Sequence, residues 1–233
     1  MKTSIFIKTC LKDLEWLSYS LRSIRKFCKG FHEVVIVADD DCKGVIEPML
    51  SGERLLLSPV HHNGYIQQQI IKCNAWVYVN NPDAILYVDS DVIFFREASP
   101  QDFMADGKPF LLKTPYGNLG GAEAWKPITE NFVGFRVSHE YMRRMPLLFL
   151  TRTVREFEQQ YAQKIVLLNR LATRDFSEFN AIGAFAAAYH PDLYRIIDTE
   201  TEPAAIPQPV AKQFWSWGGI SNEIKTEMES FLQ

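Results

Sequence analysis

The sequence predicts an α/β fold with a mostly parallel central sheet flanked by helices. Through the first half of the chain, apolar runs of strand length alternate with amphipathic segments of helical period. Such alternation is typical of parallel strands joined by helical crossovers. The chain has 233 residues, of which 47% are hydrophobic, so it can bury one large core and is short for two independent domains. We therefore expect residues 1–233 to form a single domain.

Strands and helices are expected to alternate as far as residue 89. The strands are apolar runs at residues 4–9, 33–38, 54–57 and 84–88. The first helix opens at Asp13 and stops near Gly30, since glycine commonly ends a helix. A later helix, over residues 65–78, places on one face Ile66, Ile70, Cys73 and Val77. This order predicts a Rossmann-like sheet.

The second half of the chain has a less regular pattern. In chain order, the expected elements are a strand at 109–113, a glycine-rich loop at 116–125, a strand at 131–137, and helices at 154–171 and 178–189. The tail from Thr199 to Phe214 is expected to be extended, because it contains Pro203, Pro207 and Pro209.

Composition excludes several classes of protein. A net charge of −3 and a pI near 6.0 lack the overall basicity that non-specific nucleic-acid binding needs. The cysteines have no zinc-site spacing, which favours free thiols in a reducing compartment: Cys10, Cys28, Cys42 and Cys73. No run approaches the roughly 18 apolar residues of a membrane span, and the first residues lack a secretory signal. We expect a soluble cytoplasmic protein, in a cell or in the cytoplasm of a virus-infected cell.

The tripeptide Asp89-Ser90-Asp91 is the most informative feature of the chain. It follows the buried strand expected at 84–88 and precedes a second apolar run, at 92–95. Ligands of parallel sheets bind beyond the carboxyl ends of the strands, and carboxylates in apolar surroundings need a cation. Hard oxygen ligands suit Mg²⁺ or Mn²⁺ carrying a diphosphate. The alternative is a strand cap followed by a turn aspartate.

The segment that begins at Gly64 carries a second cluster of polar residues. Gln68 and Lys72 share a helix face, and Gln69 is adjacent to them. A lysine and two amides on one helix could hold a nucleotide diphosphate. On spacing alone, a solvated helix face is the favoured interpretation.

Taken in order, these motifs resemble a group of small bacterial and viral glycosyltransferases of the GT-A fold. The resemblance rests on Gly64 with Gln68, Gln69 and Lys72, then on Leu86 to Asp91, and then on Ser177-Glu178-Phe179-Asn180 with Gly183. It spans residues 4–190. It implies a nucleotide-sugar-binding half at about 1–95, and an acceptor-side half with a C-terminal tail at about 96–233.

The resemblance also implies a donor and a metal ion. The donor would be a nucleoside-diphosphate sugar, UDP- or GDP-linked, lying across the strand ends with Mn²⁺ or Mg²⁺. Asp91 would bind the metal, and Asp89 the metal or the ribose. The other donor-binding residues would be Lys8, Thr9, Asp39, Gln68, Gln69, Lys72 and Ser90. A third metal ligand, often a histidine near the C-terminus in this fold, is matched poorly here by His190.

Glu178 is the candidate general base that deprotonates the acceptor hydroxyl, with Asp175 as its rival. A base on the face opposite the leaving group implies inversion at the anomeric carbon. The alternative is helix chemistry alone, because Ser177 at a cap and an acidic first turn stabilise any helix.

Aromatic residues in loop-like segments are candidates for acceptor binding, because sugars pack their C–H faces on rings. They are Tyr116, Trp125, Trp215 and Trp217. The tryptophans could instead fix the tail to the core. His61 and His62 lack further ligands at metal spacing and are expected in a polar loop.

These observations favour a metal-dependent glycosyltransferase that transfers a sugar to a hydroxyl of a glycan or another acceptor, with inversion. A modified base in DNA is a less favoured acceptor, because the chain is mildly acidic. The alternatives are a nucleotidyltransferase acting on a sugar phosphate and a catalytically silent sugar-nucleotide or glycan-binding protein. Pocket shape decides the sugar, base and acceptor, so the sequence does not name them.

Overall fold

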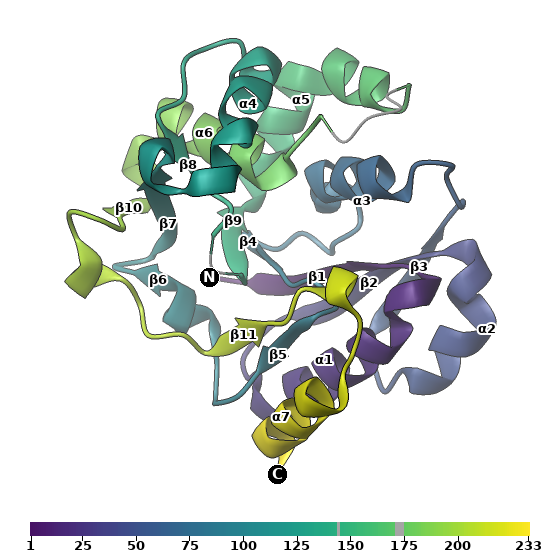
Figure 1. Ribbon diagram of the computed structural model, residues 1–233. Helices are drawn as coiled ribbons and strands as arrows, with labels where there is room; N and C mark the ends of the chain where they lie inside the picture. Colours follow the sequence, from purple (N-terminus) through teal and green to yellow (C-terminus); the bar gives the residue numbers. More distant parts are fainter. Residues whose placement is uncertain (144, 171–174) are drawn as a thin grey trace.

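The computed structural model describes residues 1–143, 145–170 and 175–233. Its centre is a five-stranded sheet with the strand order β3-β2-β1-β4-β9 (Figure 1). The parallel strands are β1 (Thr3–Thr9), β2 (Glu33–Asp39), β3 (Arg54–Ser58) and β4 (Ala84–Tyr87). At the edge, β9 (Leu147–Leu150) runs antiparallel to β4. The predicted α/β fold with a mostly parallel sheet is confirmed in this form.

Helices lie on both faces of the central sheet (Figure 1). One side carries α1 (Leu14–Phe27), and α7 (Asn222–Leu232) packs against it. The other side carries α3 (Gly64–Cys73), which contacts α5 (Thr151–Leu168) and α6 (Glu178–Tyr189). A short helix, α2 (Lys43–Ile46), follows β2. The sheet is therefore the middle of three layers.

Two smaller sheets extend the molecule beside the central one. The first joins β10 (Arg195–Asp198), β7 (Lys108–Pro115), β6 (Met104–Ala105) and β8 (His139–Glu140). The second pairs β5 (Val92–Phe94) with β11 (Ala211–Gln213) in antiparallel register, Lys212 lying opposite Ile93. This pairing brings the C-terminal segment to the residues that directly follow the Asp89-Ser90-Asp91 motif.

Several sequence-based predictions for the second half are wrong. The strand predicted at 131–137 is replaced by α4 (Trp125–Val133), because Thr129, Phe132 and Val133 are buried at helical spacing. Gly134 then ends the helix in the left-handed region, with φ +81°. The expected glycine-rich loop contains two short 3₁₀ helices, Tyr116–Asn118 and Gly120–Ala124. Helix α7 was not predicted, and Leu171, the predicted end of α5, lies outside the described residues.

The helix predicted at 65–78 is shorter than expected. It ends at Cys73, and a 3₁₀ turn follows at Ala75–Val77. Val77 is 54% exposed, so its predicted place on the buried face is wrong. The Asn74 side chain donates to the Ile70 carbonyl, a local bond that stabilises the end of the helix.

An aromatic cluster supports the end of β4, where the candidate site begins. The ring of Tyr87 lies 5.8 Å from Phe6, 6.0 Å from Phe149 and 5.3 Å from Phe179, measured between centroids. Its hydroxyl donates to the carbonyl of Lys72 at 3.0 Å. The cluster thus fixes β4, α3 and α6 relative to one another.

Two further expectations concern the chain as a whole. All four cysteines are free, as expected from their spacing. Within the described ranges, no helix is both long enough and apolar enough to cross a membrane.

Substitution of Gly183 tests how closely α6 packs. An alanine Cβ at Gly183 would lie 2.3 Å from Cβ and 2.7 Å from Cγ of Tyr141. We expect Gly183→Ala to lower the free energy of unfolding in urea by about 2 kcal/mol, because overpacking outweighs the gain in helix propensity. Gly44→Ala is the control: no atom lies within 4 Å, so it should be neutral or stabilising. Equal behaviour of the two variants would contradict this packing.

Candidate active site

The candidate site lies at the carboxyl ends of β1, β2 and β4, which meet at one edge of the sheet. Lys8 Nζ lies 2.6 Å from Asp39 Oδ1 and donates to the Thr9 carbonyl at 2.6 Å. Ser90 Oγ donates to Thr9 Oγ1 at 3.0 Å. The structure therefore brings together four predicted site residues from three strand ends. All four are buried, and their polar side chains are paired with one another.

Lys72 links the carboxyl end of β4 to the start of α6. Its Nζ lies 2.8 Å from Asp89 Oδ1 and 3.0 Å from Glu178 Oε1, and 4.8 Å from the centroid of the Phe179 ring. Lys72 is only 4% exposed, so the predicted alternative of a solvated helix face is wrong for this residue. Burial alone would lower the pKa of Lys72, but the carboxylates of Asp89 and Glu178 outweigh burial and raise it. The ammonium group is therefore charged at neutral pH.

The start of α6 is held by side-chain hydrogen bonds. Asn180 Nδ2 donates to Ser177 Oγ, and Asn180 Oδ1 accepts from the backbone N–H of Tyr141 at 2.8 Å. Ser177 occupies the N-cap position, yet its hydroxyl makes no capping bond. The Ser177-Glu178-Phe179-Asn180 segment thus fixes the direction in which Glu178 points, and capping by Ser177 does not explain it.

The C-terminal segment covers Asp91. The backbone N–H of Ser216 donates to Asp91 Oδ2 at 2.7 Å, and the N–H of Phe214 donates to the Asp91 carbonyl at 3.0 Å. The Gln213 amide nitrogen lies 3.4 Å from Asp91 Oδ1 and 3.5 Å from Asp89 Oδ2. Burial and the neighbouring Asp89 charge raise the pKa of Asp91 to about 6. The hydrogen bonds from Ser216 and Gln213 offset this increase in pKa only in part.

The acidic pair fits a divalent cation in part. Asp89 Oδ2 and Asp91 Oδ1 face the same Gln213 nitrogen over contacts at the long limit of a hydrogen bond. Mg²⁺ and Mn²⁺ bind through one or two carboxylates and complete their shell with water and phosphate oxygens. Among the residues the structure describes, no group of three or more His, Cys, Asp or Glu is placed to hold a metal. Any metal held by this pair would therefore complete its shell with water or substrate oxygens.

The predicted histidine and glutamine candidates lie in different environments. His190 ends α6, where it bonds Glu156 at 2.8 Å and Thr153 at 3.0 Å, whereas Glu178 begins that helix. The rings of His61 and His62 lie 4.1 Å apart, beside the start of α3. Gln69 is buried, and within the described chain its Oε1 has no hydrogen-bond partner; Gln68 is partly exposed.

The four aromatic candidates do not gather at one place. Trp215 and Trp217 are 58% and 86% exposed and flank Ser216, so they lie beside the acidic pair. Tyr116 is buried against the core, which corrects its prediction as a loop aromatic. Trp125 is half-buried at the start of α4. Asp175, the rival base, is exposed.

Sequence reasoning missed Gln213 and the Ser216 amide. Both reach Asp91 from more than 120 residues away, and neither belongs to a recognisable motif. The Trp-Ser-Trp-Gly-Gly segment was the available signal. Its glycines and aromatic residues are typical of a substrate-binding loop, but they do not indicate which residues the loop contacts.

Comparison with known proteins does not assign this chain to a family. No model of a known protein family matches the chain, and a search of curated proteins finds no match to it. The function of the chain is therefore inferred from the residues of the candidate site.

Removing the Lys72 charge should destabilise the fold. Lys72→Met leaves Glu178 buried and Asp89 largely buried without their cation, so we expect a loss of about 3 kcal/mol in unfolding free energy. Glu178→Gln in the same chain should recover part of that loss, giving a coupling above about 1 kcal/mol in a double-mutant cycle. Lys43→Met, at an exposed position, should change stability by less than about 0.5 kcal/mol. Additive effects of the Lys72 and Glu178 changes would contradict the ion pair.

The raised pKa of Asp91 predicts a pH-dependent stability in the absence of metal. Between the ordinary value of 3.8 and about 6, the native state binds more protons at Asp91 than the unfolded state. The contribution of Asp91 to unfolding free energy should therefore fall as pH rises through this window, by up to about 3 kcal/mol, and stay constant above it. Asp91→Asn should become more stable relative to wild type from pH 4 to pH 7 in urea titrations. A difference that does not vary with pH would refute the shift.

Proposed function

We propose that the protein is a metal-dependent glycosyltransferase with a GT-A fold, moving a sugar from a nucleoside-diphosphate sugar to an acceptor hydroxyl. The observation that carries this proposal is the convergence of Asp89 and Asp91 at the strand edge, facing one Gln213 nitrogen. Further support comes from the mostly parallel sheet, whose carboxyl edge is the usual place for nucleotide ligands. In this proposal Lys8, Thr9, Asp39 and Ser90 line the nucleoside side.

Asp89 and Asp91 would hold Mn²⁺ or Mg²⁺, which when bound supplies charge compensation for the departing diphosphate. A cation there would also offset the burial and the Asp89 charge that raise the pKa of Asp91. Lys72 would contribute to donor binding indirectly, by orienting Asp89, because its ammonium group is buried between two carboxylates. This is a narrower role than direct contact with phosphate.

Glu178 is the proposed general base. Its side chain is fixed by Lys72 at 3.0 Å and by the packing of the α6 start. The chain of contacts from Glu178 through Lys72 to Asp89 links the base to the metal-binding pair. In an inverting transfer, the acceptor hydroxyl would give its proton to Glu178 as its oxygen bonds to the anomeric carbon.

A thermal-shift screen of nucleotide sugars with Mn²⁺ tests the proposal. The correct donor with Mn²⁺ should raise the melting temperature, since saturation at a hundred times Kd adds about 2.7 kcal/mol of stability. Asp91→Asn should abolish the part of this rise in melting temperature that depends on Mn²⁺. Asp41→Asn, at an exposed position after β2, should retain that part. Release of nucleoside diphosphate supports glycosyl transfer, and release of pyrophosphate would favour a nucleotidyltransferase. Donor binding without turnover would favour a catalytically silent sugar-nucleotide-binding protein.

Glu178→Gln separates a base from a structural ion-pair partner. For a base, transfer should fall about a hundred- to ten-thousand-fold while donor affinity is kept, because an amide does not accept the proton. Steady-state kinetics and donor titration on one sample measure both. Asp175→Asn, in the exposed rival, should leave turnover within about threefold of wild type. Near-normal transfer by Glu178→Gln would remove it from the mechanism, and a product of retained configuration would reject inversion.

A further inference from the structure

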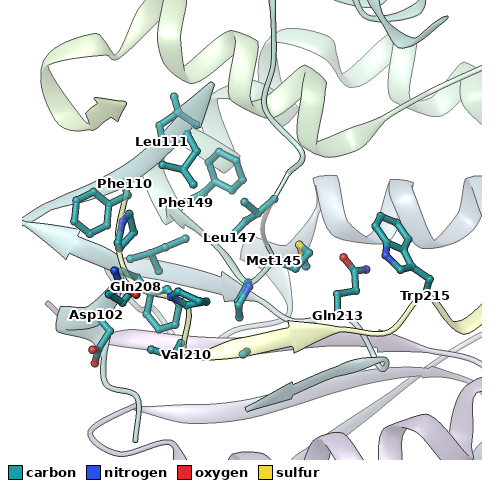
Figure 2. Close-up of a pocket in the computed structure, with 17 residues that line it drawn as sticks. Asp102, Phe110, Leu111, Met145, Leu147, Phe149, Gln208, Val210, Gln213 and Trp215 are labelled. Carbon is teal, nitrogen blue, oxygen red and sulfur yellow. The ribbon is translucent and has the colours of Figure 1, made fainter. Parts of the chain in front are cut away.

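An apolar cavity of about 320 Å³ lies between the C-terminal segment and the neighbouring strands (Figure 2). Its size is at the low end of the range for small-molecule sites. One wall comes from β7 and β9, and the other from residues 207–211, which lead into β11. Most lining side chains are aliphatic or aromatic, among them Phe110, Leu112, Leu147, Phe149 and Val210.

The cavity adjoins the acidic pair. Gln213 and Trp215 line it, and Gln213 is the residue whose amide nitrogen faces both Asp89 and Asp91. Figure 2 shows Gln213 and Trp215 together at one end, while Asp102 and Phe110 lie at the other. A molecule in the cavity would therefore present one end to the proposed site of transfer.

We propose that this cavity receives the apolar body of the acceptor, a short alkyl chain or single aromatic ring that carries one hydroxyl. This inference rests on the proposed glycosyl transfer and deepens it by naming the acceptor class. An apolar body gains free energy by leaving water for these walls, because its apolar surface is removed from water. A sugar or nucleotide acceptor would have to bury hydroxyls or charges against the apolar side chains that make up most of these walls, and those side chains offer no hydrogen-bond partner.

The hydroxyl is then placed at the Gln213 end. Its oxygen forms the new bond to the anomeric carbon, and the bond from that carbon to the diphosphate oxygen breaks. The nucleoside diphosphate leaves with the electron pair, and the hydroxyl proton passes through water to the proposed base, Glu178, which does not itself line the cavity. No oxidant, reductant or further reactant is needed.

Fluorescence of N-phenyl-1-naphthylamine, a neutral probe that emits in apolar sites, tests binding without donor or turnover. We expect the probe to bind the wild-type protein and 1-octanol to displace it, whereas glycerol should not. Leu112→Trp, which fills the cavity from β7, should weaken probe binding about tenfold or more. Ile196→Trp, on β10 and outside the lining, is the matched control and should bind normally. Gln208→Trp, at an exposed position on the opposite wall, provides a second filled variant if Leu112→Trp does not fold.

Donor binding and transfer are measured on the same variants. With the donor and Mn²⁺ found by the thermal-shift screen, 1-octanol should be glycosylated by wild type and about tenfold less by Leu112→Trp, at unchanged donor affinity. Donor binding without probe binding, or equal probe binding by the filled variants, would overturn the acceptor inference alone. Probe binding without any donor binding would instead overturn the proposed function, and with it the assignment of the cavity to an acceptor.

Discussion

The buried ammonium group of Lys72 is the interaction on which the candidate site depends. It lies between Asp89, which follows β4, and Glu178, which begins α6, and it is carried by α3. One side chain thus sets the positions of three elements that are distant in the sequence. Replacing water around three charges is costly, and only mutual pairing makes it tolerable. The hydrogen bonds among Ser177, Asn180 and the Tyr141 amide fix the start of α6, which carries one of these charges.

The first half of the fold was predictable from sequence because its signals are local. An apolar run such as residues 33–38 specifies a buried strand wherever it occurs, and the following acidic residues mark the strand end. The prediction of α6 succeeded for the same reason. By contrast, residues 131–137 contain enough β-forming side chains to suggest a strand, and only tertiary contacts reveal that Thr129, Phe132 and Val133 are buried from a helix.

The residues of the candidate site likewise differ in whether a local sequence signal identifies them. Asp89, Asp91 and Lys72 were identifiable because their residue types and spacing restrict what they can do. The structure then places Lys72 between two carboxylates, a partnership that no periodicity encodes. Gln213 and the Ser216 amide were unpredictable, since their meeting with Asp91 depends on the pairing of β11 with β5. A backbone donor carries no residue-type signal at all.

The distance along the chain between Asp91 and the segment that covers it has a consequence for synthesis. The Gln213 amide follows Asp91 by 122 residues. At the usual 5–20 residues per second, translation separates them by roughly 6 to 24 s. Throughout that interval Asp89 can pair with Lys72, which is already synthesised, whereas Asp91 lacks the amides of Gln213 and Ser216 and is solvated by water or a cellular cation. In the nascent chain, Asp91 is therefore exposed to the ions of its compartment before the C-terminal segment that covers it has been synthesised.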